Sequence, residues 1–408
     1  MDDSSVQRLA PMADGTRDEL SPIPITRPLF GPEEFAAVQR PLESGWVVQG
    51  PFVKEFEGRF SAFTGAPHSI ASSSCTTALH LAVAALGLGP GDEVIVPAFT
   101  WVATANVVEY MGARPVFCDI DLATYNIDVD QAASLVGPRT VGIIPVHLFG
   151  LCADMDPLLD LARAHGLWTV EDAACALGGW YRGRHAGTLG DAGAFSFHPR
   201  KSITTGEGGM ITTANRGLAE TCRSLRDHGA TRSDLDRHEH AGYLLSEYDR
   251  LGYNYRMTDI QGALGCAQMD RLETILEARR KRAERYDEWL AGIDWLEPPH
   301  VPEGQVHGYQ GYVCLFRPSA PTMDSLAGMR ARRNALMAQL EASGVATRQG
   351  THSPILQGFY REKYGIRPEA FPLSSMADGL TLALPLYPQM TDAEQDRVIG
   401  ALRAFSPG

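Results

Sequence analysis

The sequence has few cysteines, and they form no paired motif. There are seven, an odd number, scattered along 408 residues without any CxxC pair: Cys75, Cys118, Cys152, Cys175, Cys222, Cys266 and Cys314. Most lie in apolar segments such as VFCDI and YVCLF, where a thiol behaves as a small packed side chain. This pattern excludes a disulfide framework and is typical of reduced thiols in the cytosol.

Long apolar runs and an excess of positive charge are also missing. No uninterrupted apolar segment approaches membrane-spanning length, and the N-terminal residues contain no hydrophobic signal core. Lys and Arg together number 36 against 49 Asp and Glu, which gives a formal net charge of -13. Because a nucleic-acid surface needs clustered positive charge, we expect no nucleic-acid partner. Because the long apolar runs are missing, we expect no membrane partner and a cytoplasmic protein.

The sequence does have enough length and hydrophobic content for two domains. Its 408 residues are 44% hydrophobic, which is ordinary for a globular enzyme and more than one domain usually needs. Residues 1–22 are polar without a sustained apolar period, and they predict a flexible N-terminal tail. We expect a large domain over residues 23–270 and a smaller C-terminal domain over residues 271–408.

Short β-rich runs alternate with helical stretches over much of the first half. The runs are HSIAS, DEVIVP, RPVFCDID, TVGIIPVHL, LWTVEDA, AGAFSFH and GGMITTA, with helices expected at 33–46, 76–86, 102–110 and 157–165. This alternation predicts an α/β fold, with a mainly parallel central sheet and helices on both faces. Two later runs, GYVCLF and LTLALPL, with helices at 323–343 and 391–405, predict a smaller α+β domain. Ligands of such sheets bind beyond the carboxyl ends of the strands.

A lysine and an aspartate follow two of these runs. Lys201 lies in SFHPRKSITTGEGG, between a strand and a Gly-rich turn, and Asp172 follows the apolar run LWTVE. A pyridine cofactor that acts through an imine needs a lysine at its aldehyde and a carboxylate at its ring nitrogen. Two neighbouring strand ends can supply this pair. The alternatives are a solvated loop lysine and a salt-bridged or helix-capping Asp172.

Three further patterns each have two interpretations. Hydroxyl residues in SSSCTTALHLA precede a helix, and they favour either an anion site or simple N-capping. Trp101 follows a β run, where it could lie against an aromatic ring, although an isolated aromatic there is more often a core residue. The segment His238-Glu239-His240 has no matching ligand cluster, so we expect no metal site.

Six motifs, in order along the chain, resemble those of a known family. They are SSSCTTAL, PAFTWVATAN, PVHLFG, EDAACALGG, SFHPRKSITTGEGG and GYNYRMTDIQGALG. The set resembles the DegT/DnrJ/StrS family of aminotransferases from about Ile23 to the C-terminus. Members are fold-type-I enzymes that use pyridoxal 5'-phosphate (PLP), and many act on nucleotide-linked ketosugars. The resemblance therefore implies a PLP-dependent aminotransferase that passes through pyridoxamine phosphate.

The resemblance also implies roles for individual residues in a homodimer with shared active sites. Lys201 would bind the cofactor as an imine and move the substrate proton, and Asp172 would pair with the pyridinium nitrogen. Further implied cofactor contacts are Thr76, Thr77 and Ser196 at the phosphate, Trp101 on the ring, Cys175, and Asn254 from the neighbouring subunit. We hypothesise substrate contacts for Trp46, His147, His198 and Arg348, with a structural role as an equal alternative for His147 and Arg348.

The chain departs from the family pattern at several positions. Cys175 stands where the family commonly has Gln, and Cys75 where it has Gly. The Gln usually assists at the cofactor's phenolic oxygen, so this contact differs here. In the C-terminal part, Gln310 and either Ile355 or Leu356 stand where the family often has histidines. These departures bear on the substrate and leave the transaminase assignment unchanged.

The reaction expected from the resemblance is a ping-pong transamination through Lys201. L-glutamate or L-glutamine is the donor, and the acceptor is a ketosugar, with a nucleotide-linked 4-keto-6-deoxyhexose as the leading choice. A keto-cyclitol of an antibiotic pathway is the alternative acceptor. A PLP-dependent sugar dehydratase would replace the lysine by histidine, and a non-catalytic regulatory protein would leave the Lys201–Asp172 pair unexplained. Lys201 must be neutral to act, and burial would lower its pKa in that direction.

Overall fold

A seven-stranded sheet forms the centre of the computed structural model, which describes residues 21–231 and 246–407. The strand order is β1-β9-β8-β5-β4-β2-β3. Strand β9 is antiparallel to β1 and β8, whereas the other neighbouring pairs are parallel. The strands are β1 (His68–Ser72), β2 (Glu93–Pro97), β3 (Arg114–Cys118), β4 (Thr140–Ile143), β5 (Trp168–Asp172), β8 (Ala192–Ser196) and β9 (Gly209–Thr213). The predicted mainly parallel sheet is confirmed.

Successive residues of a central strand face two different layers of helices. Ile95 of β2 packs with α2 (Pro51–Thr64), α6 (Met155–His165) and α9 (Asp259–Asp270). Val94 and Val96 pack on the opposite face with α3 (Cys75–Ala85), α4 (Ala103–Tyr110) and α7 (Arg216–Arg226). Side chains alternate along a strand, so apolar residues at successive positions bury both faces of the sheet. Helices on both faces, as predicted, are confirmed.

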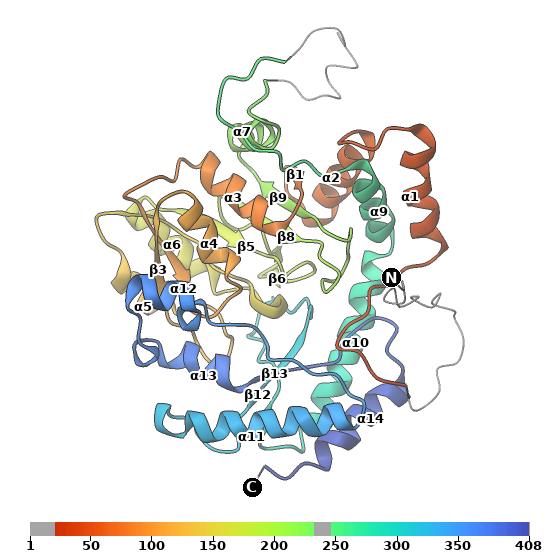
Figure 1. The fold of residues 1–408 in the computed structure, drawn as a ribbon, viewed down its shortest axis with the longest axis vertical. Helices are drawn as coiled ribbons and strands as arrows, with labels where there is room; N and C mark the ends of the chain where they lie inside the picture. The colour runs from red at the N-terminus through yellow and green to blue at the C-terminus, as the bar shows by residue number, and fades with distance from the viewer. Residues whose placement is uncertain (1–20, 232–245, 408) are drawn as a thin grey trace, which may run out of the picture.

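A second sheet lies in the C-terminal part of the chain. It has the order β10-β12-β13, from β10 (Leu296–Glu297), β12 (Tyr312–Phe316) and β13 (Thr381–Leu384). Helix α10 (Leu272–Leu290) leads into it, and α11 (Met323–Ala342) and α14 (Asp392–Arg403) share its apolar cluster. Figure 1 shows α11 and α14 at the end of the molecule opposite α7. The predicted boundary between residues 270 and 271 stays a prediction.

The remaining elements are short or lie at the edges. They are α1 (Pro32–Ser44), α5 (Val129–Leu135), α12 (Gly358–Tyr364), α13 (Pro372–Leu380), the 3-10 turns Leu148–Gly150, Pro354–Leu356 and Pro368–Ala370, and a small sheet of β6 (Trp180–Tyr181), β7 (Arg184–His185) and β11 (Gln305–Val306). Helix α1 ends two residues before the predicted limit because Gly45 adopts a left-handed conformation with φ 73.

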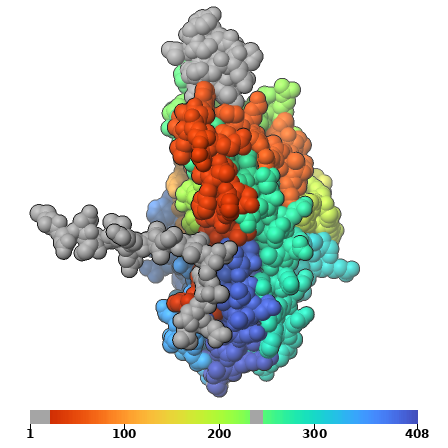
Figure 2. Space-filling model, turned by 90° about the vertical axis from the view of Figure 1, so that its right-hand side faces the viewer, coloured from red at the N-terminus to blue at the C-terminus, as the bar shows by residue number. Residues whose placement is uncertain are grey.

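Residues near the N-terminus contact the C-terminal part. Ile23 pairs with Val345, and the Leu386 amide donates to the Ile25 carbonyl at 3.0 Å. Figure 2 shows the red N-terminal region directly above blue C-terminal residues, with green residues of the α9–α10 region beside both. The tail predicted over residues 1–22 lies outside the described residues except for its last two. Across the described ranges, no helix combines the length and the apolar character that a membrane span needs.

Candidate active site

Lys201 lies in the turn that follows strand β8. The strand ends at Ser196, and the turn closes where the Lys201 amide donates to the His198 carbonyl at 2.8 Å. The Lys201 side chain is partly buried, and its Nζ donates to the Cys175 sulfur at 3.1 Å. This contact argues against a solvated loop lysine.

Asp172 is the last residue of β5 and is buried. Its Oδ2 accepts a hydrogen bond from the Thr104 hydroxyl at 2.7 Å, and its Oδ1 accepts one from the Ala174 amide at 3.2 Å. Strands β5 and β8 are parallel neighbours, with Asp172 opposite Ala194. Lys201 and Asp172 therefore lie beyond the same edge of the sheet, where the carboxyl ends of the strands meet.

The charges of this edge influence one another. Burial lowers the pKa of Lys201, but three neighbouring acidic groups raise it by more, so that it lies above the ordinary lysine value. These groups are Cys175, Cys75 and Asp172. Burial thus acts in the expected direction, but in this structure the acidic groups that face the amine outweigh it. Burial also raises the pKa of Asp172, and the Thr104 hydroxyl and nearby Lys201 offset part of this rise.

The start of α3 offers backbone donors beside the same edge. Ser74 caps the helix by accepting from the Thr77 amide at 3.1 Å, and the Thr77 hydroxyl accepts from the Ser74 amide at 2.9 Å. N-capping, one of the two interpretations, is thus present. Among the described residues, the Cys75 and Thr76 amides have no acceptor, so the helix start keeps donors for an anion. Gly209 of β9 allows this approach, since a Cβ there would lie 2.2 Å from the Ser74 carbonyl oxygen.

The other predicted cofactor contacts come from separate segments. Trp101 lies between β2 and α4 and is 58% exposed, so the alternative of a core residue is wrong. Its ring centroid is 6.0 Å from that of His352. Ser196 is partly buried at the end of β8, where its hydroxyl accepts from the His198 amide at 3.4 Å. Asn254 is exposed. Within the described part of the chain, no hydrogen bond joins these residues to Lys201, and their roles stay predictions.

His147 is buried completely, and both of its ring nitrogens are bonded within the core. Its Nδ1 accepts from the Ala153 amide at 3.1 Å, so its Nε2 carries the proton and donates to Glu171 at 2.7 Å. The His147 backbone amide donates to the Asp172 carbonyl at 3.0 Å. This arrangement favours the structural alternative for His147 over a substrate contact.

The other hypothesised substrate contacts lie in three different places. Trp46 follows α1, and its indole Nε1 donates to a backbone carbonyl three residues further on at 3.3 Å. His198 is partly buried in the turn that carries Lys201, and burial lowers its pKa. Arg348 is exposed, and it lies close enough to Arg200 to add to the effect of burial, which lowers the Arg200 pKa. These contacts stay predictions.

Three residues that shape the site were not among those predicted. Thr104 holds the Asp172 carboxylate, but a hydroxyl residue in a helix carries no distinctive signal. Gln310 donates to the Arg200 carbonyl at 2.7 Å and so links the C-terminal part to the Lys201 turn. Glu171 is buried, and its position inside an apolar β run was an available signal, because glutamate is almost never buried without partners.

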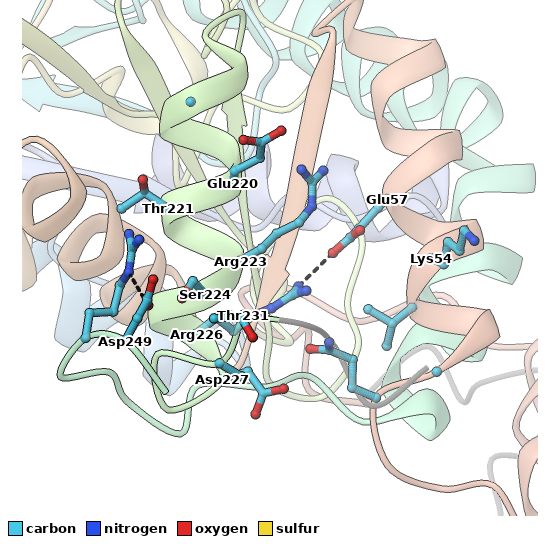
Figure 3. A pocket seen from close by; sticks show the side chains of 16 residues that line it. Lys54, Glu57, Glu220, Thr221, Arg223, Ser224, Arg226, Asp227, Thr231 and Asp249 are labelled. Carbon is cyan, nitrogen blue, oxygen red and sulfur yellow. Dashed lines mark hydrogen bonds and ion pairs between the residues drawn. The ribbon is translucent and has the colours of Figure 1, made fainter. Parts of the chain in front are cut away.

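A cavity of about 820 Å³ lies between α2, α7 and residues 227–231 and 249–250 (Figure 3). Its lining pairs acids with bases: Arg226 contacts Glu57 at 2.7 Å, and Arg250 contacts Asp249 at 3.1 Å. None of the predicted site residues lines it. Because most of its charges already have partners, we favour the sheet edge of Lys201 and Asp172 as the candidate active site.

A metal centre has no support in residues 21–231 and 246–407. No group of three or more His, Cys, Asp or Glu side chains in these ranges could hold a metal ion. The segment His238-Glu239-His240 lies outside the described residues.

The donor groups of this sheet edge fit a pyridine cofactor that carries an aldehyde and a phosphate. Lys201 offers an amine, Asp172 a buried carboxyl group and the start of α3 backbone donors without an acceptor in the described chain. These are the groups that an aldehyde, a ring nitrogen and a phosphate respectively need.

Comparison with known proteins agrees with this chemistry. The model of the DegT/DnrJ/EryC1/StrS aminotransferase family matches residues 28–403. The chain is 39% identical to the spore coat polysaccharide biosynthesis protein SpsC of Bacillus subtilis, over 95% of this chain and 97% of that protein. It is 38% identical to GDP-perosamine synthase of Caulobacter vibrioides, over 94% and 98% of the two chains. The solved structure of the aminotransferase TlmJ from Streptoalloteichus hindustanus superposes with a TM-score of 0.83 at 34% identity, over 94% and 98% of the chains.

Proposed function

Because the chain belongs to the DegT/DnrJ/EryC1/StrS aminotransferase family, we propose that it moves an amino group from L-glutamate or L-glutamine to a ketosugar. The family membership, the fold-type-I architecture and the aminotransferase class expected from the sequence are confirmed. The donor and the acceptor are the proposal. The leading acceptor is a nucleotide-linked 4-keto-6-deoxyhexose.

The observation that carries the acceptor is the similarity to an enzyme named for a GDP-linked amine. GDP-perosamine synthase is 38% identical to this chain over 386 residues. A second relative is named for the biosynthesis of a spore coat polysaccharide. Since both similarities span nearly the whole of each chain, they include the strand ends and the C-terminal part that together would bind an acceptor.

Eight residues would hold pyridoxal 5'-phosphate in this proposal. Thr76, Thr77 and Ser196 would bind the phosphate, together with the free amides at the start of α3. The complete set is Thr76, Thr77, Trp101, Asp172, Cys175, Ser196, Lys201 and Asn254. When bound, the cofactor supplies an aldehyde that carries the amino group and a ring that accepts electrons from the reacting carbon.

Asp172 and Lys201 would perform the proton chemistry. The buried Asp172 carboxylate, fixed by Thr104, would hold a proton on the ring nitrogen and so keep the ring electron-accepting. Lys201 would take a proton from the amino-bearing carbon of the donor and return it at the cofactor carbon that belongs to the aldehyde. Its turn, closed at 2.8 Å between the Lys201 amide and the His198 carbonyl, keeps the amine at the strand end throughout.

The reaction would run as two half-reactions at one site. The donor would leave as its keto acid after giving up its amino group, and the acceptor would enter afterwards. Lys201 serves both halves, because the second reverses the proton movements of the first. Donor and acceptor would therefore compete for one space.

We also propose a homodimer and two domains. Residues 23–270 would form the cofactor-binding domain and residues 271–408 the smaller one, with the acceptor bound where they meet. Asn254 would reach the cofactor phosphate of the partner subunit. Its exposure in a single chain is compatible with this role.

Replacing Lys201 tests the proposal at its centre. Purified wild-type protein should carry a visible absorbance band of the lysine-bound cofactor, and L-glutamate should bleach it. Lys201→Ala should lose the band and lose turnover by at least about 10³-fold, because both the covalent attachment and the proton carrier are removed.

The matched control is Lys281→Ala, because Lys281 is an exposed lysine of α10. This variant should keep band and turnover, and circular dichroism should show that both variants are folded. An unchanged band in Lys201→Ala would refute the assignment. A panel of nucleotide-linked ketosugars and cyclitol ketones, assayed with both donors, then tests the acceptor: preference for a free cyclitol ketone would refute the nucleotide-sugar proposal.

A further inference from the structure

Cys175 makes a contact with Lys201 that the proposed reaction does not use. Lys201 Nζ donates to the Cys175 sulfur at 3.1 Å, from the turns that follow the neighbouring strands β8 and β5. The turn that carries Cys175 is itself fixed, because the Ala174 amide donates to the Asp172 carboxylate at 3.2 Å and the Ala176 amide closes a backbone bond at 2.9 Å. Two rigid strand ends thus bring the sulfur to the amine.

Cys175 differs from the other six cysteines in its contact with a lysine. In five of them the thiol is buried, namely Cys118, Cys152, Cys222, Cys266 and Cys314. Burial raises the pKa of each of these five thiols and also that of Cys75. All seven cysteines lie in the described residues, and Cys175 alone among them accepts a hydrogen bond from a lysine.

The groups around Lys201 favour a charged amine. The titratable neighbours are Cys175 and Asp172 from the β5 end, Cys75 from the start of α3, and His198 from its own turn. Burial lowers the Lys201 pKa, and the acidic neighbours, with Cys175 first among them, raise it above the ordinary value. An ammonium at this position therefore has a specific partner for its proton.

We propose that Cys175 is a positioning residue for Lys201, in which the sulfur and the amine share one proton and hold each other at the strand ends whenever Lys201 is not joined to the cofactor. The inference rests on the proposed role of Lys201 as the cofactor lysine. When an amine is needed, the proton passes from Nζ to Sγ, so that ammonium and thiolate become amine and thiol. It returns afterwards, and no electrons or outside reagents are involved.

Two substitutions separate sharing a proton from merely filling space. A glutamine at position 175 can accept a hydrogen bond from an ammonium but does not take its proton near neutral pH. A serine keeps the size class of the side chain, and its hydroxyl also stays protonated. Cys175→Gln and Cys175→Ser should therefore behave alike if the proton matters, and differently if only packing matters.

The first experiment measures the sulfur. Full-length wild type and Lys201→Met, freed of cofactor by donor treatment and dialysis, are labelled with iodoacetamide at neutral pH and followed by peptide mass spectrometry. Because the thiolate is the reactive form, Cys175 should be labelled about tenfold faster in wild type. Buried Cys314 should stay unlabelled in both proteins, which shows that each is folded. Equal rates at Cys175 would overturn the proposal.

The second experiment measures the amine. The rate at which the full chain captures added pyridoxal phosphate, read from the visible band, is recorded against pH. Removing Cys175 removes an influence that raises the Lys201 pKa, so the midpoint should move to lower pH, by about one unit, in both variants. Cys75→Ser is the matched control and should move it less, because Cys75 makes no hydrogen bond to Lys201 in the described structure.

The two experiments distinguish a failure of this inference from a failure of the proposed function. A midpoint that stays in place or rises in Cys175→Gln overturns the shared proton. Capture by Lys201→Ala that equals the wild type would instead refute the role of Lys201, while the labelling rates would still report on the contact between the two side chains.

Discussion

At the scale of single residues, the burial of Asp172 opposes the ionisation that its proposed role needs. Its carboxyl group is buried, which raises its pKa, yet the proposed chemistry needs it ionised beside the ring nitrogen. Hydrogen bonds from Thr104 and the Ala174 amide offset part of the cost of the charge. The protein with this buried charge should therefore be less stable toward unfolding than a variant without it.

Asp172→Asn should make the cofactor-free protein more stable at neutral pH. The folded state binds a proton at Asp172 more tightly than the unfolded chain, so the ionised carboxylate costs stability as pH rises above the ordinary value of 3.8. The melting temperature of the variant should exceed that of wild type by about 2–4 °C at pH 7, and the gap should shrink near pH 4. Differential scanning fluorimetry across this pH range measures it.

The same variant should lose activity. An asparagine cannot hold a charge opposite a protonated ring nitrogen, so turnover should fall by about 10²–10³-fold. Asp160→Asn is the control, because Asp160 is exposed on α6 and should change neither melting nor turnover. A variant that melts lower than wild type at pH 7 would show that the carboxylate is stabilising and would contradict the argument.

At the scale of elements, Glu171 ties a loop to strand β5. Its carboxylate accepts from His147 and from the amides of Gly187, Leu189 and Gly190, each at 2.7 Å. Four donors satisfy a charge that is completely buried. The loop before β8 is thereby fixed against the strand that carries Asp172.

Glu171→Ala should destabilise the protein by about 3–5 kcal/mol, because it leaves three amides and an imidazole buried without an acceptor. Urea unfolding measures the change. Glu220→Ala, which removes an exposed ion pair with Arg216, is the control and should have no measurable effect. A loss as small as that of the control would mean that water replaces the carboxylate in this loop.

Elements that bury a regular apolar pattern were predictable, and those held by distant contacts were not. The residues of β1 and of β5 lie inside the runs HSIAS and LWTVEDA. A capping box begins α14 inside the helix predicted at 391–405, since the Thr391 hydroxyl accepts from the Glu394 amide and the Glu394 carboxylate from the Thr391 amide, at 3.1 and 2.8 Å. Strand β11 has two residues, and it is defined by its pairing with β6 across more than a hundred residues.

The residues of the candidate site also divide into those that the sequence predicts and those that only distant contacts define. Asp172 ends one strand and Lys201 follows another, and a short apolar run reveals each strand, so strand-end reasoning locates both residues. Thr104 contacts Asp172 only because β2 and β5 lie in one sheet, each followed by a connection over the same edge. The sequence leaves a substrate contact and a structural role equally open for His147. Its two ring nitrogens are bonded to Ala153 and Glu171, which the sequence does not reveal.

At the scale of the whole molecule, the proposal takes one cofactor contact, Asn254, from a second chain. Asn254 is exposed, and the same segment exposes two large apolar side chains, Tyr248 at 61% and Leu251 at 91%. Large apolar side chains exposed together in one segment are compatible with a surface that a partner covers. We predict that this segment contacts a second copy of the chain and that each active site takes Lys201 and Asn254 from different subunits.

Mixing two inactive variants tests this arrangement. Lys201→Ala and Asn254→Ala dimers should each have little activity, because every site lacks one of the two groups. After subunit exchange, random pairing makes about half of the dimers mixed, and each mixed dimer holds one intact site and one doubly altered site. The mixture should therefore recover about a quarter of the wild-type turnover, and it should recover none if both groups come from one chain, because every site then stays defective.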